Sequence, residues 1–381
     1  MSDDATWGWF DRSRLGGRPI SRHTWAVGAL LALALAGCGG GSGASTSPAR
    51  DGAHAGGITV VRERQLDGRL QDWTLRTPAL RGDTHVRVLL PAGYARQPDR
   101  RYPVLYLLHG CCDDYRAWTR SGGAEAISAR FPIIVVMPDG GRMGWYTDWY
   151  RHGVPVRPMW ERYHIGQLVP WIDHRFRTFA TRRGRAIAGL SMGGFGALSY
   201  AARHPQLFIA AASFSGALEI GSPGAWGPRA SNTGRWRAHL PIELAARLRS
   251  LALVELRIGN GTPGPLDPPH TAAGCKPCRL ERALHPMSVR LHDKLRELGI
   301  PHLWDNYGPG THSWPYWRRD LRETLPDLMR VLDRSRTGVA TRGMSAPGIR
   351  SAGRRDVSTR GVPRRAASPR GAPARSASRR R

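Results

Sequence analysis

Lysine and acidic side chains are scarce in this chain of 381 residues. It contains 57 lysines and arginines against 29 aspartates and glutamates, for a formal net charge of +28, and only Lys276 and Lys294 are lysines. An excess of this size is typical of nucleic-acid-binding proteins when it forms a patch or stripe on a folded domain. About twelve of the excess charges instead lie after Ser335. We therefore expect no specific nucleic-acid partner.

Large apolar residues are nearly absent from residues 335–381. A segment of this composition cannot bury enough surface to offset the entropy of ordering, so it is predicted to be a disordered, Arg-rich tail. Two roles stay open for the tail. It is either a solvated extension without a partner, or a segment that makes non-specific electrostatic contact with anionic envelope polymers or membrane.

The apolar run near the N-terminus is too short to span a membrane, which needs about 20 residues. This run, TWAVGALLALALAGC, follows an arginine-containing segment and has the length of a signal-peptide core. Its last four residues, LAGC, resemble a bacterial lipobox, so residues 1–37 are predicted to be a lipoprotein signal peptide with Cys38 lipidated. The alternative is an ordinary secretory signal cleaved nearby. Both predict export, the first adds attachment to the cell membrane, and residues 38–57 then form a flexible tether.

Only four cysteines follow this segment: Cys111, Cys112, Cys275 and Cys278. A structural zinc site needs four ligands at matched spacing, and the single CKPC motif has no second pair, so no metal site is predicted. Because export permits disulfides, the four cysteines are expected to pair with one another, with the connectivity left open. No cofactor is predicted.

Residues 58–334 contain no internal repeat and no linker-like segment, and they are long enough for one large domain. Apolar runs such as YPVLYLLHG, PIIVVMPDG and LVELRIGNG alternate with helical patterns such as GGFGALSYAARHP and WPYWRRDLRETLPDLMRVLDR. Continuous apolar strands separated by helices are typical of a mostly parallel sheet covered on both faces. The sequence therefore predicts a single doubly wound α/β domain.

Gly189, Ser191 and Gly193 form a G-x-S-x-G motif where the strand-like GRAIAGLS meets the helical MGGFGALSYAARHP. At such a junction the small residues allow a sharp turn that holds the serine hydroxyl out at the end of the sheet. The N-terminus of the following helix favours developing negative charge. Ser191 is thus the candidate nucleophile, and a turn that needs only a small residue is the alternative for the motif alone.

A serine nucleophile needs a base, which in this fold follows the nucleophile and the acid along the chain. His312 lies on the Gly-rich segment YGPGTHSW, after the last predicted strand and before the final helix, where its imidazole can turn back toward Ser191. The acid has two candidates, Asp267 after the strand LVELRIGNG and Glu281 further on. Spacing alone favours Asp267.

Stabilising the oxyanion of an acyl-transfer reaction needs two preorganised N–H donors. The backbone N–H of Met192, directly after the nucleophile, is expected to supply one. The backbone N–H of Cys111, in the loop after YPVLYLLHG, is expected to supply the other. His109, at the start of this loop, is expected to shape it and not to react.

Five motifs in order carry a family resemblance: DDYRAW, GGRMGWYTDWY, GLSMGG, GNGTP and GTHSWPYW. Over about residues 58–333 the chain resembles the esterase family that holds esterase D and the antigen 85 mycolyltransferases, and the motifs resemble the mycolyltransferase branch. The resemblance implies an α/β-hydrolase fold and, as the acid, a glutamate that follows a leucine on a helix before the histidine. Leu280 and Glu281 match this pattern, so the resemblance favours Glu281 over Asp267.

The site and the resemblance together predict an exported serine esterase or acyltransferase that acts on small-molecule or lipid esters through an acyl-enzyme. One alternative is mycolyl transfer to an envelope sugar. The mycolyltransferase branch carries aspartate and arginine near the oxyanion loop for sugar binding, where this chain has His109 and Cys112. The other alternative is an envelope-binding protein that keeps the fold without catalysis.

Overall fold

The computed structural model describes residues 55–150, 157–219, 221 and 223–336, all within one compact unit, residues 51–381. The predicted signal peptide, Cys38, most of the tether and nearly all of the Arg-rich tail lie outside the described residues. What the structure describes is thus the predicted α/β domain.

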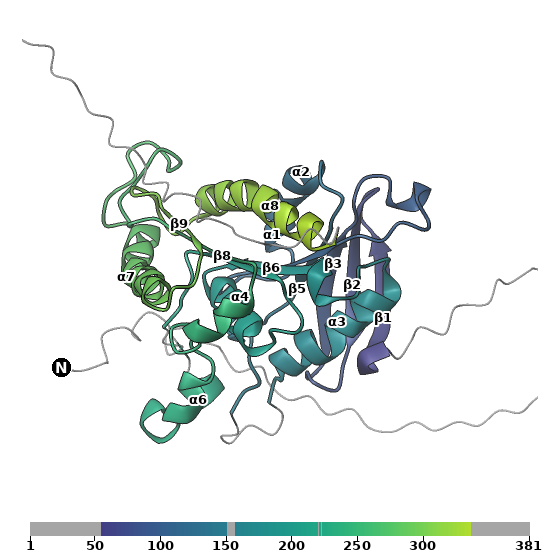
Figure 1. The fold of residues 1–381 in the computed structure, drawn as a ribbon, viewed down its shortest axis with the longest axis horizontal. Coiled ribbons are helices and arrows are strands. Elements are labelled where there is room, and N and C mark those ends of the chain that lie inside the picture. Colours follow the sequence, from purple (N-terminus) through teal and green to yellow (C-terminus); the bar gives the residue numbers. More distant parts are fainter. Residues whose placement is uncertain (1–54, 151–156, 220, 222, 337–381) are drawn as a thin grey trace, which may run out of the picture. The chain divides into compact units, whose positions relative to one another are not determined.

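A nine-stranded sheet forms the centre of this domain, with the order β1-β2-β3-β5-β4-β6-β7-β8-β9 (Figure 1). The five pairings from β5 to β9 are parallel, and the three pairings that involve β1, β2 and β3 are antiparallel. This mostly parallel sheet confirms the predicted class. The strands are β1 (Thr59–Gln65), β2 (Leu70–Arg76), β3 (Asp83–Leu89), β4 (Val104–Leu108), β5 (Ile134–Pro138), β6 (Arg185–Leu190), β7 (Ala210–Phe214), β8 (Leu253–Ile258) and β9 (Leu303–Asn306).

Helices join and cover these strands. They are α1 (Ala117–Arg120), α2 (Ala124–Ser128), α3 (Val169–Arg175), α4 (Met192–Arg203), α5 (Pro223–Trp226), α6 (Thr233–Arg237), α7 (Lys276–Glu297) and α8 (Trp314–Arg336). Shorter 3₁₀ segments are η2 (Ala55–Gly57), η3 (Tyr94–Arg96), η5 (Arg182–Gly184), η6 (Arg229–Ser231) and η7 (Ala245–Ser250), and η4 (Arg162–Leu168) is a π-helix. Within the described ranges, no helix combines the length and the apolar character that crossing a membrane requires.

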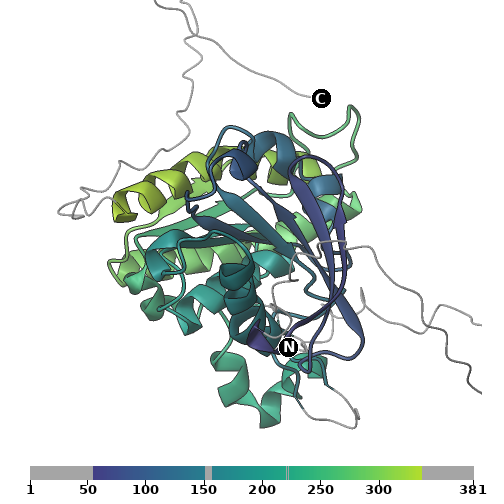
Figure 2. The same ribbon diagram turned by 90° about the vertical axis from the view of Figure 1, so that its right-hand side faces the viewer.

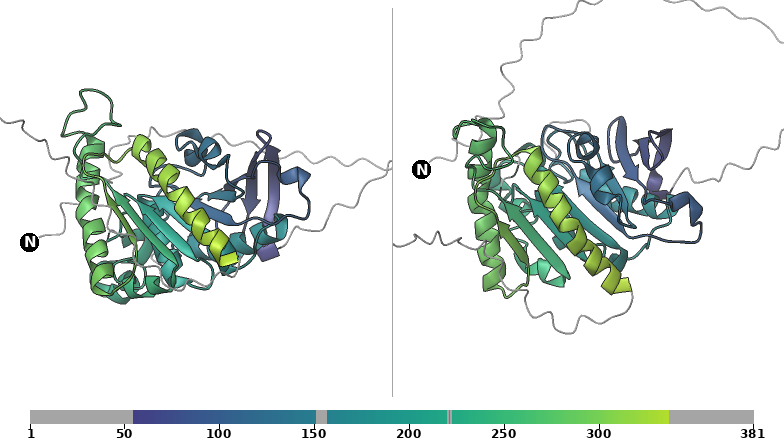
Figure 3. Two further views of the ribbon diagram at one scale, coloured as in Figure 1. Left: turned by 45° about the horizontal axis from the view of Figure 1, so that its top comes forward. Right: turned by 90° about the horizontal axis from the view of Figure 1, so that it is seen from above.

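Both faces of the sheet are buried in strands β4 to β8, where successive side chains point to opposite faces and helices cover each side. In β4, Tyr106 and Leu108 belong to one core cluster, which includes side chains of α3, α4 and α7. Leu105 and Leu107 belong to the other, which includes side chains of α1, α2 and α8. Figure 1 places α8 and α4 on opposite sides of the sheet, and Figures 2 and 3 show α8, in yellow-green, running across its face. The domain is therefore doubly wound, as predicted.

Two elements depart from the usual residue pattern of a strand or a helix. Strand β1, at one edge of the sheet, lacks an apolar face: six of its seven residues are exposed and one is half-buried. Helix α7 begins at Lys276 and runs through Pro286, a residue that usually ends or kinks a helix. Burial of Cys278, Glu281 and Leu284 on one face keeps the first part of α7 helical despite the proline.

Buried His164, on η4, makes the stability of the domain sensitive to acid. Its Nε2 donates to the carbonyl of Asp139 at 2.8 Å, and its Nδ1 lies 3.0 Å from the Tyr200 hydroxyl. Burial lowers the pKa of His164 to about 4. In the unfolded chain this histidine has a pKa of about 6.5, so it binds a proton at a higher pH than in the folded domain. The stability that neutral His164 contributes is therefore complete above about pH 6.5 and is lost as the pH falls to about 4.

We expect His164→Gln to make the free energy of unfolding depend less on pH between 6.5 and 4. The free energy of unfolding of the wild type should fall by about 3 kcal/mol between pH 6.5 and 4 on account of His164 alone. The variant should be less stable at pH 7, because it loses the ring's packing and hydrogen bonds. Its free energy of unfolding should nevertheless fall less as the pH is lowered. Urea unfolding at several pH values measures both slopes, and equal slopes would contradict the assignment to His164.

Candidate active site

Ser191 occupies the turn between β6 and α4, at the junction that the sequence predicts. Its φ of 54° lies in the left-handed region, where a residue other than glycine is uncommon and strained. The Ser191 N–H donates to Phe214 O at 2.9 Å, and Ser191 O accepts from the N–H groups of Phe195 and Ala217, both at 3.1 Å. These three bonds hold the strained turn, which is the geometry of a nucleophile elbow.

The glycines of the motif are required by close backbone contacts. A Cβ on Gly189 would lie 2.4 Å from the carbonyl oxygen of Gly193. A Cβ on Gly193 would lie 2.5 Å from the carbonyl oxygens of Leu108 and His109. Because the opposing atoms are backbone, a larger residue at either position would displace β4 or the start of α4.

His312 bridges Ser191 and Glu281. Its Nε2 lies 2.9 Å from Ser191 Oγ, and its Nδ1 lies 2.7 Å from Glu281 Oε2. The His312 side chain is 6% exposed and that of Glu281 is fully buried. The ring also packs edge-on against Trp317, with 4.9 Å between centroids. With Nδ1–H donating to the carboxylate, Nε2 is left to accept the serine proton.

The other oxygen of Glu281 is also satisfied. Its Oε1 accepts from the Ser215 hydroxyl at 2.8 Å and from the Gly259 N–H at 2.9 Å. Ser215 Oγ in turn accepts from Trp317 Nε1 at 3.2 Å. Groups that directly follow β7 and β8 thus orient a carboxylate carried by α7, and Trp317 of α8 supports one of them.

Asp267, the other candidate acid, ties two loops together instead. Its carboxylate accepts from the Thr311 and Tyr316 hydroxyls, the latter at 2.8 Å, and from the Gly264 N–H at 2.8 Å. Burial and the Asp267 carboxylate raise the pKa of Tyr316 to about 12, so the phenol stays protonated and donates. Asp267 therefore holds the loop next to His312, while Glu281 contacts the imidazole itself.

The loop after β4 lies against the nucleophile turn. A Cβ on Gly110 would lie 2.5 Å from Leu190 Cδ1 and 3.2 Å from Ser191 Cβ. His109 is buried and braces this loop: its Nε2 accepts from the Gly140 N–H at 2.9 Å, and its Nδ1 donates to Gly110 O at 2.8 Å. These contacts give His109 the loop-shaping role that the sequence predicts.

All four cysteines of the described domain form disulfides, as predicted, and the structure supplies the connectivity. One links the adjacent Cys111 and Cys112 in the loop after β4, and the other links Cys275 to Cys278 at the start of α7. The backbone of Cys112 has a φ of 68°, and its N–H donates to Arg142 O at 2.7 Å. Within the described ranges, no group of three or more His, Cys, Asp or Glu side chains could hold a metal ion.

Ser215 and Trp317 are the parts of the site that sequence reasoning missed. Ser215 directly follows β7, the strand beside β6, so it lies at the same edge of the sheet as Ser191. A polar residue just after a parallel strand was the available signal, since ligand and catalytic sites gather at this edge. Trp317 ends the GTHSWPYW motif, but its contact with His312 depends on how α8 packs.

Residues 77–328 match the profile of a protein family described as "Putative esterase". The chain belongs to this esterase family. An esterase of Mycobacterium tuberculosis (strain H37Rv) is 46% identical over 166 residues, which is 43% of this chain and 36% of that protein. The chain thus spans about a third of the length of that relative. The diacylglycerol acyltransferase/mycolyltransferase Ag85B of Mycolicibacterium smegmatis is 31% identical over 260 residues, 60% of this chain and 77% of that protein.

Solved structures agree on the fold of this family member. An S-formylglutathione hydrolase from Agrobacterium tumefaciens aligns with a TM-score of 0.58 at 16% identity, covering 72% of this chain and 99% of its own. Mycobacterium tuberculosis MPT51 aligns with a TM-score of 0.54 at 24% identity, covering 71% and 99%. The domain therefore has the α/β-hydrolase fold that the resemblance implies.

Proposed function

We propose that this family member is a serine esterase or acyltransferase, with Ser191 as nucleophile, His312 as base and Glu281 as the acid that orients it. The observation that carries the proposal is the unbroken chain of hydrogen bonds from Ser191 Oγ through both nitrogens of His312 to Glu281. A serine hydroxyl is a weak nucleophile unless such a base accepts its proton. Burial of the pair away from water strengthens this interaction.

In the first half of the reaction, Ser191 Oγ attacks the ester carbonyl carbon while His312 Nε2 takes its proton. Glu281 stabilises the imidazolium that forms. The backbone N–H groups of Cys111 and Met192 stabilise the oxyanion. The C–O bond to the alcohol then breaks, His312 returns its proton to the leaving alkoxide, and the acyl group stays on Ser191.

In the second half, water or an alcohol attacks the acyl-enzyme, with His312 again as base. Water releases a carboxylic acid and an alcohol forms a new ester, so one site supports hydrolysis and transfer. The Ag85B relative supports transfer as an alternative, because its name is that of a diacylglycerol acyltransferase/mycolyltransferase. A binding protein without catalysis would not need the Ser191, His312 and Glu281 set.

We also propose that the enzyme works outside the cytoplasm, anchored through a lipidated Cys38 or released after ordinary signal cleavage. Two disulfides in the domain support export, since disulfides persist in oxidising compartments. The Arg-rich tail, residues 335–381, would then be placed to contact anionic envelope polymers or membrane.

Substrate profiling of the purified chain tests this function. Hydrolysis of p-nitrophenyl acetate, butyrate and palmitate should be saturable, and the ratio among them reports the acyl length that the site accepts. Adding a sugar or glycerol acceptor should divert the acyl group into a new ester if transfer competes with hydrolysis. Absence of turnover on every ester by the folded protein would refute the proposal in favour of a binding role.

A further inference from the structure

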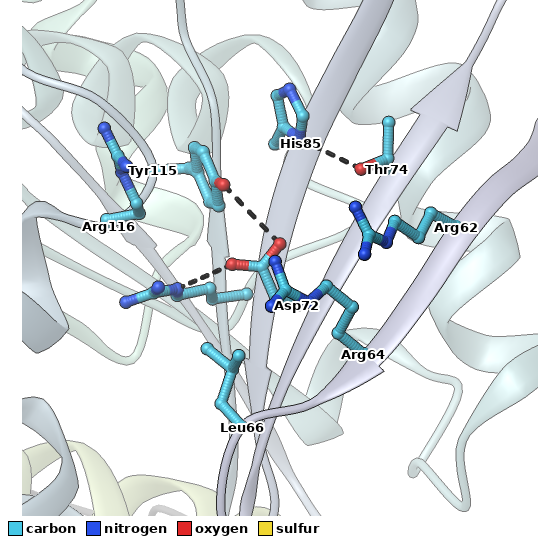
Figure 4. A pocket seen from close by; sticks show the side chains of 9 residues that line it. Arg62, Arg64, Leu66, Asp72, Thr74, His85, Tyr115 and Arg116 are labelled. Carbon is cyan, nitrogen blue, oxygen red and sulfur yellow. Dashed lines mark hydrogen bonds and ion pairs between the residues drawn. The ribbon is translucent and has the colours of Figure 1, made fainter.

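A pocket of about 230 Å³ lies on one face of the antiparallel strands β1, β2 and β3 (Figure 4). Its floor consists of two rows of directly opposed residues, Arg62, Thr74 and His85 in one row and Arg64, Asp72 and Arg87 in the next. Directly opposed residues of an antiparallel sheet point to the same face. Strand register thus brings three arginines together, and Tyr115 and Arg116 of the DDYRAW motif add a wall.

Two of the four arginines of this pocket already have carboxylate partners. Arg87 Nε donates to Asp72 Oδ2 at 3.0 Å, with both side chains largely buried. Arg116 donates to Asp114 Oδ2 at 2.6 Å. Asp72 is the one carboxylate among the described residues that line the pocket. These two pairs leave Arg62 and Arg64 as the source of net positive charge.

Arg62 and Arg64 are exposed and uncompensated. In the part of the chain that the structure describes, neither side chain has a hydrogen bond, an ion pair or a ring contact. Figure 4 shows both reaching from β1 over the neighbouring strand, toward Thr74 and Asp72. Two like charges on one concave face repel each other, so an anion between them would be favoured.

Charged side chains on an edge strand also discourage pairing with other chains. That role requires neither a concave face nor an ordered wall, and this pocket has both. The Tyr115 ring stacks on His85, with 4.9 Å between centroids and 13° between planes. The guanidinium groups of Arg87 and Arg116 each lie 5.7 Å from the centre of the Tyr115 ring. These contacts fix the Tyr115 ring in place without a ligand.

We propose that this pocket binds a phosphate group, held by the guanidinium groups of Arg62 and Arg64, while the Tyr115 hydroxyl stays hydrogen-bonded to Asp72 Oδ1 at 3.5 Å. Guanidinium donors match phosphate oxygens in pairs, and a phosphate monoester carries about −1.5 to −2 charges at neutral pH, which balances two free arginines. At about 230 Å³ the pocket is smaller than the roughly 300 Å³ at which sites for drug-sized ligands begin. Its size suits a small headgroup, and the proposal does not depend on the proposed esterase activity.

Isothermal titration of the full chain with inorganic phosphate at low salt tests the site. The variant R62Q/R64Q should bind at least about tenfold more weakly than the wild type, because charge-assisted hydrogen bonds are lost. The matched control R237Q/R247Q removes two exposed arginines of α6 and η7, and should stay within about twofold of the wild type. Equal phosphate affinity in the two double variants would overturn the proposal. Unchanged thermal unfolding and p-nitrophenyl butyrate hydrolysis show that both variants fold.

A third variant is expected to strengthen phosphate binding. Asp72→Asn removes the carboxylate of the pocket and frees Arg87, so phosphate should bind several-fold tighter. Weaker phosphate binding by the folded variant would contradict the assignment to this pocket.

The source of the phosphate is distinguished with glycerol 3-phosphate, using glycerol as the neutral control. Tighter binding of glycerol 3-phosphate than of inorganic phosphate assigns the pocket to an organic phosphate headgroup. Weaker binding assigns it to the free anion. In both cases R62Q/R64Q must lose the binding, and binding of neither phosphate compound overturns the proposal.

Discussion

Ser191→Ala is expected to lower kcat for ester hydrolysis by about 10⁶-fold while the domain stays folded. The substitution removes the oxygen that forms the acyl-enzyme, and no neighbouring group can replace it. His312 and Glu281 then hydrogen-bond with each other but have no nucleophile to activate. Initial rates on p-nitrophenyl butyrate, with single-turnover detection of the acyl-enzyme, measure the loss.

Ser199→Ala is the matched control for this substitution. Ser199 lies on α4, two turns after Ser191, is fully buried, and has a hydroxyl without a hydrogen-bond partner among the described residues. Its replacement should leave kcat within about twofold, because buried unpaired hydroxyls contribute little favourable energy. Activity retained in a folded S191A protein would refute the proposed mechanism.

Glu281→Gln is expected to lower kcat by about 10⁴-fold with little change in KM, as loss of the orienting carboxylate does in other serine hydrolases. Glutamine can keep the bonds from Ser215 and Gly259 with its carbonyl oxygen. Its amide nitrogen then faces His312 Nδ1, which must become the acceptor. The ring proton moves to Nε2, and the imidazole can no longer take the proton of Ser191.

Asp267→Asn is the companion variant that separates contact with His312 from support of its loop. The asparagine side chain retains one oxygen for Tyr316 and Gly264, so kcat should stay within about threefold. The free energy of unfolding should fall by about 1 kcal/mol, because one hydrogen bond of the loop is weakened. Urea unfolding and kcat measured on both variants give the ranking. A larger loss of kcat in D267N than in E281Q would show that Asp267 and not Glu281 serves His312.

The choice between Asp267 and Glu281 could not be made from spacing in the chain. Spacing favoured Asp267, because it lies in the loop that follows β8, and only the family resemblance pointed to Glu281. Helix α7 starts after that loop, and its buried face turns Glu281 toward β7 and β8. Which face of a helix meets the sheet depends on packing over the whole length of the helix. The spacing of residues in the chain does not contain that information.

The sequence by itself determined the doubly wound α/β class, and it nominated Ser191 and His312. Both follow from local physics: apolar strands alternate with amphipathic helices, and a glycine-flanked serine at a strand-to-helix junction makes a strained turn. Tertiary structure decided between Asp267, which spacing favours, and Glu281, which the resemblance favours, because Glu281 contacts His312. It alone decided that Ser215 and Gly259 hold this carboxylate, and that each cysteine pairs with its nearest neighbour. It also decided that Arg64 lies opposite Asp72 and Arg87, and Arg62 opposite Thr74 and His85, because strand register joins residues that are distant in the chain.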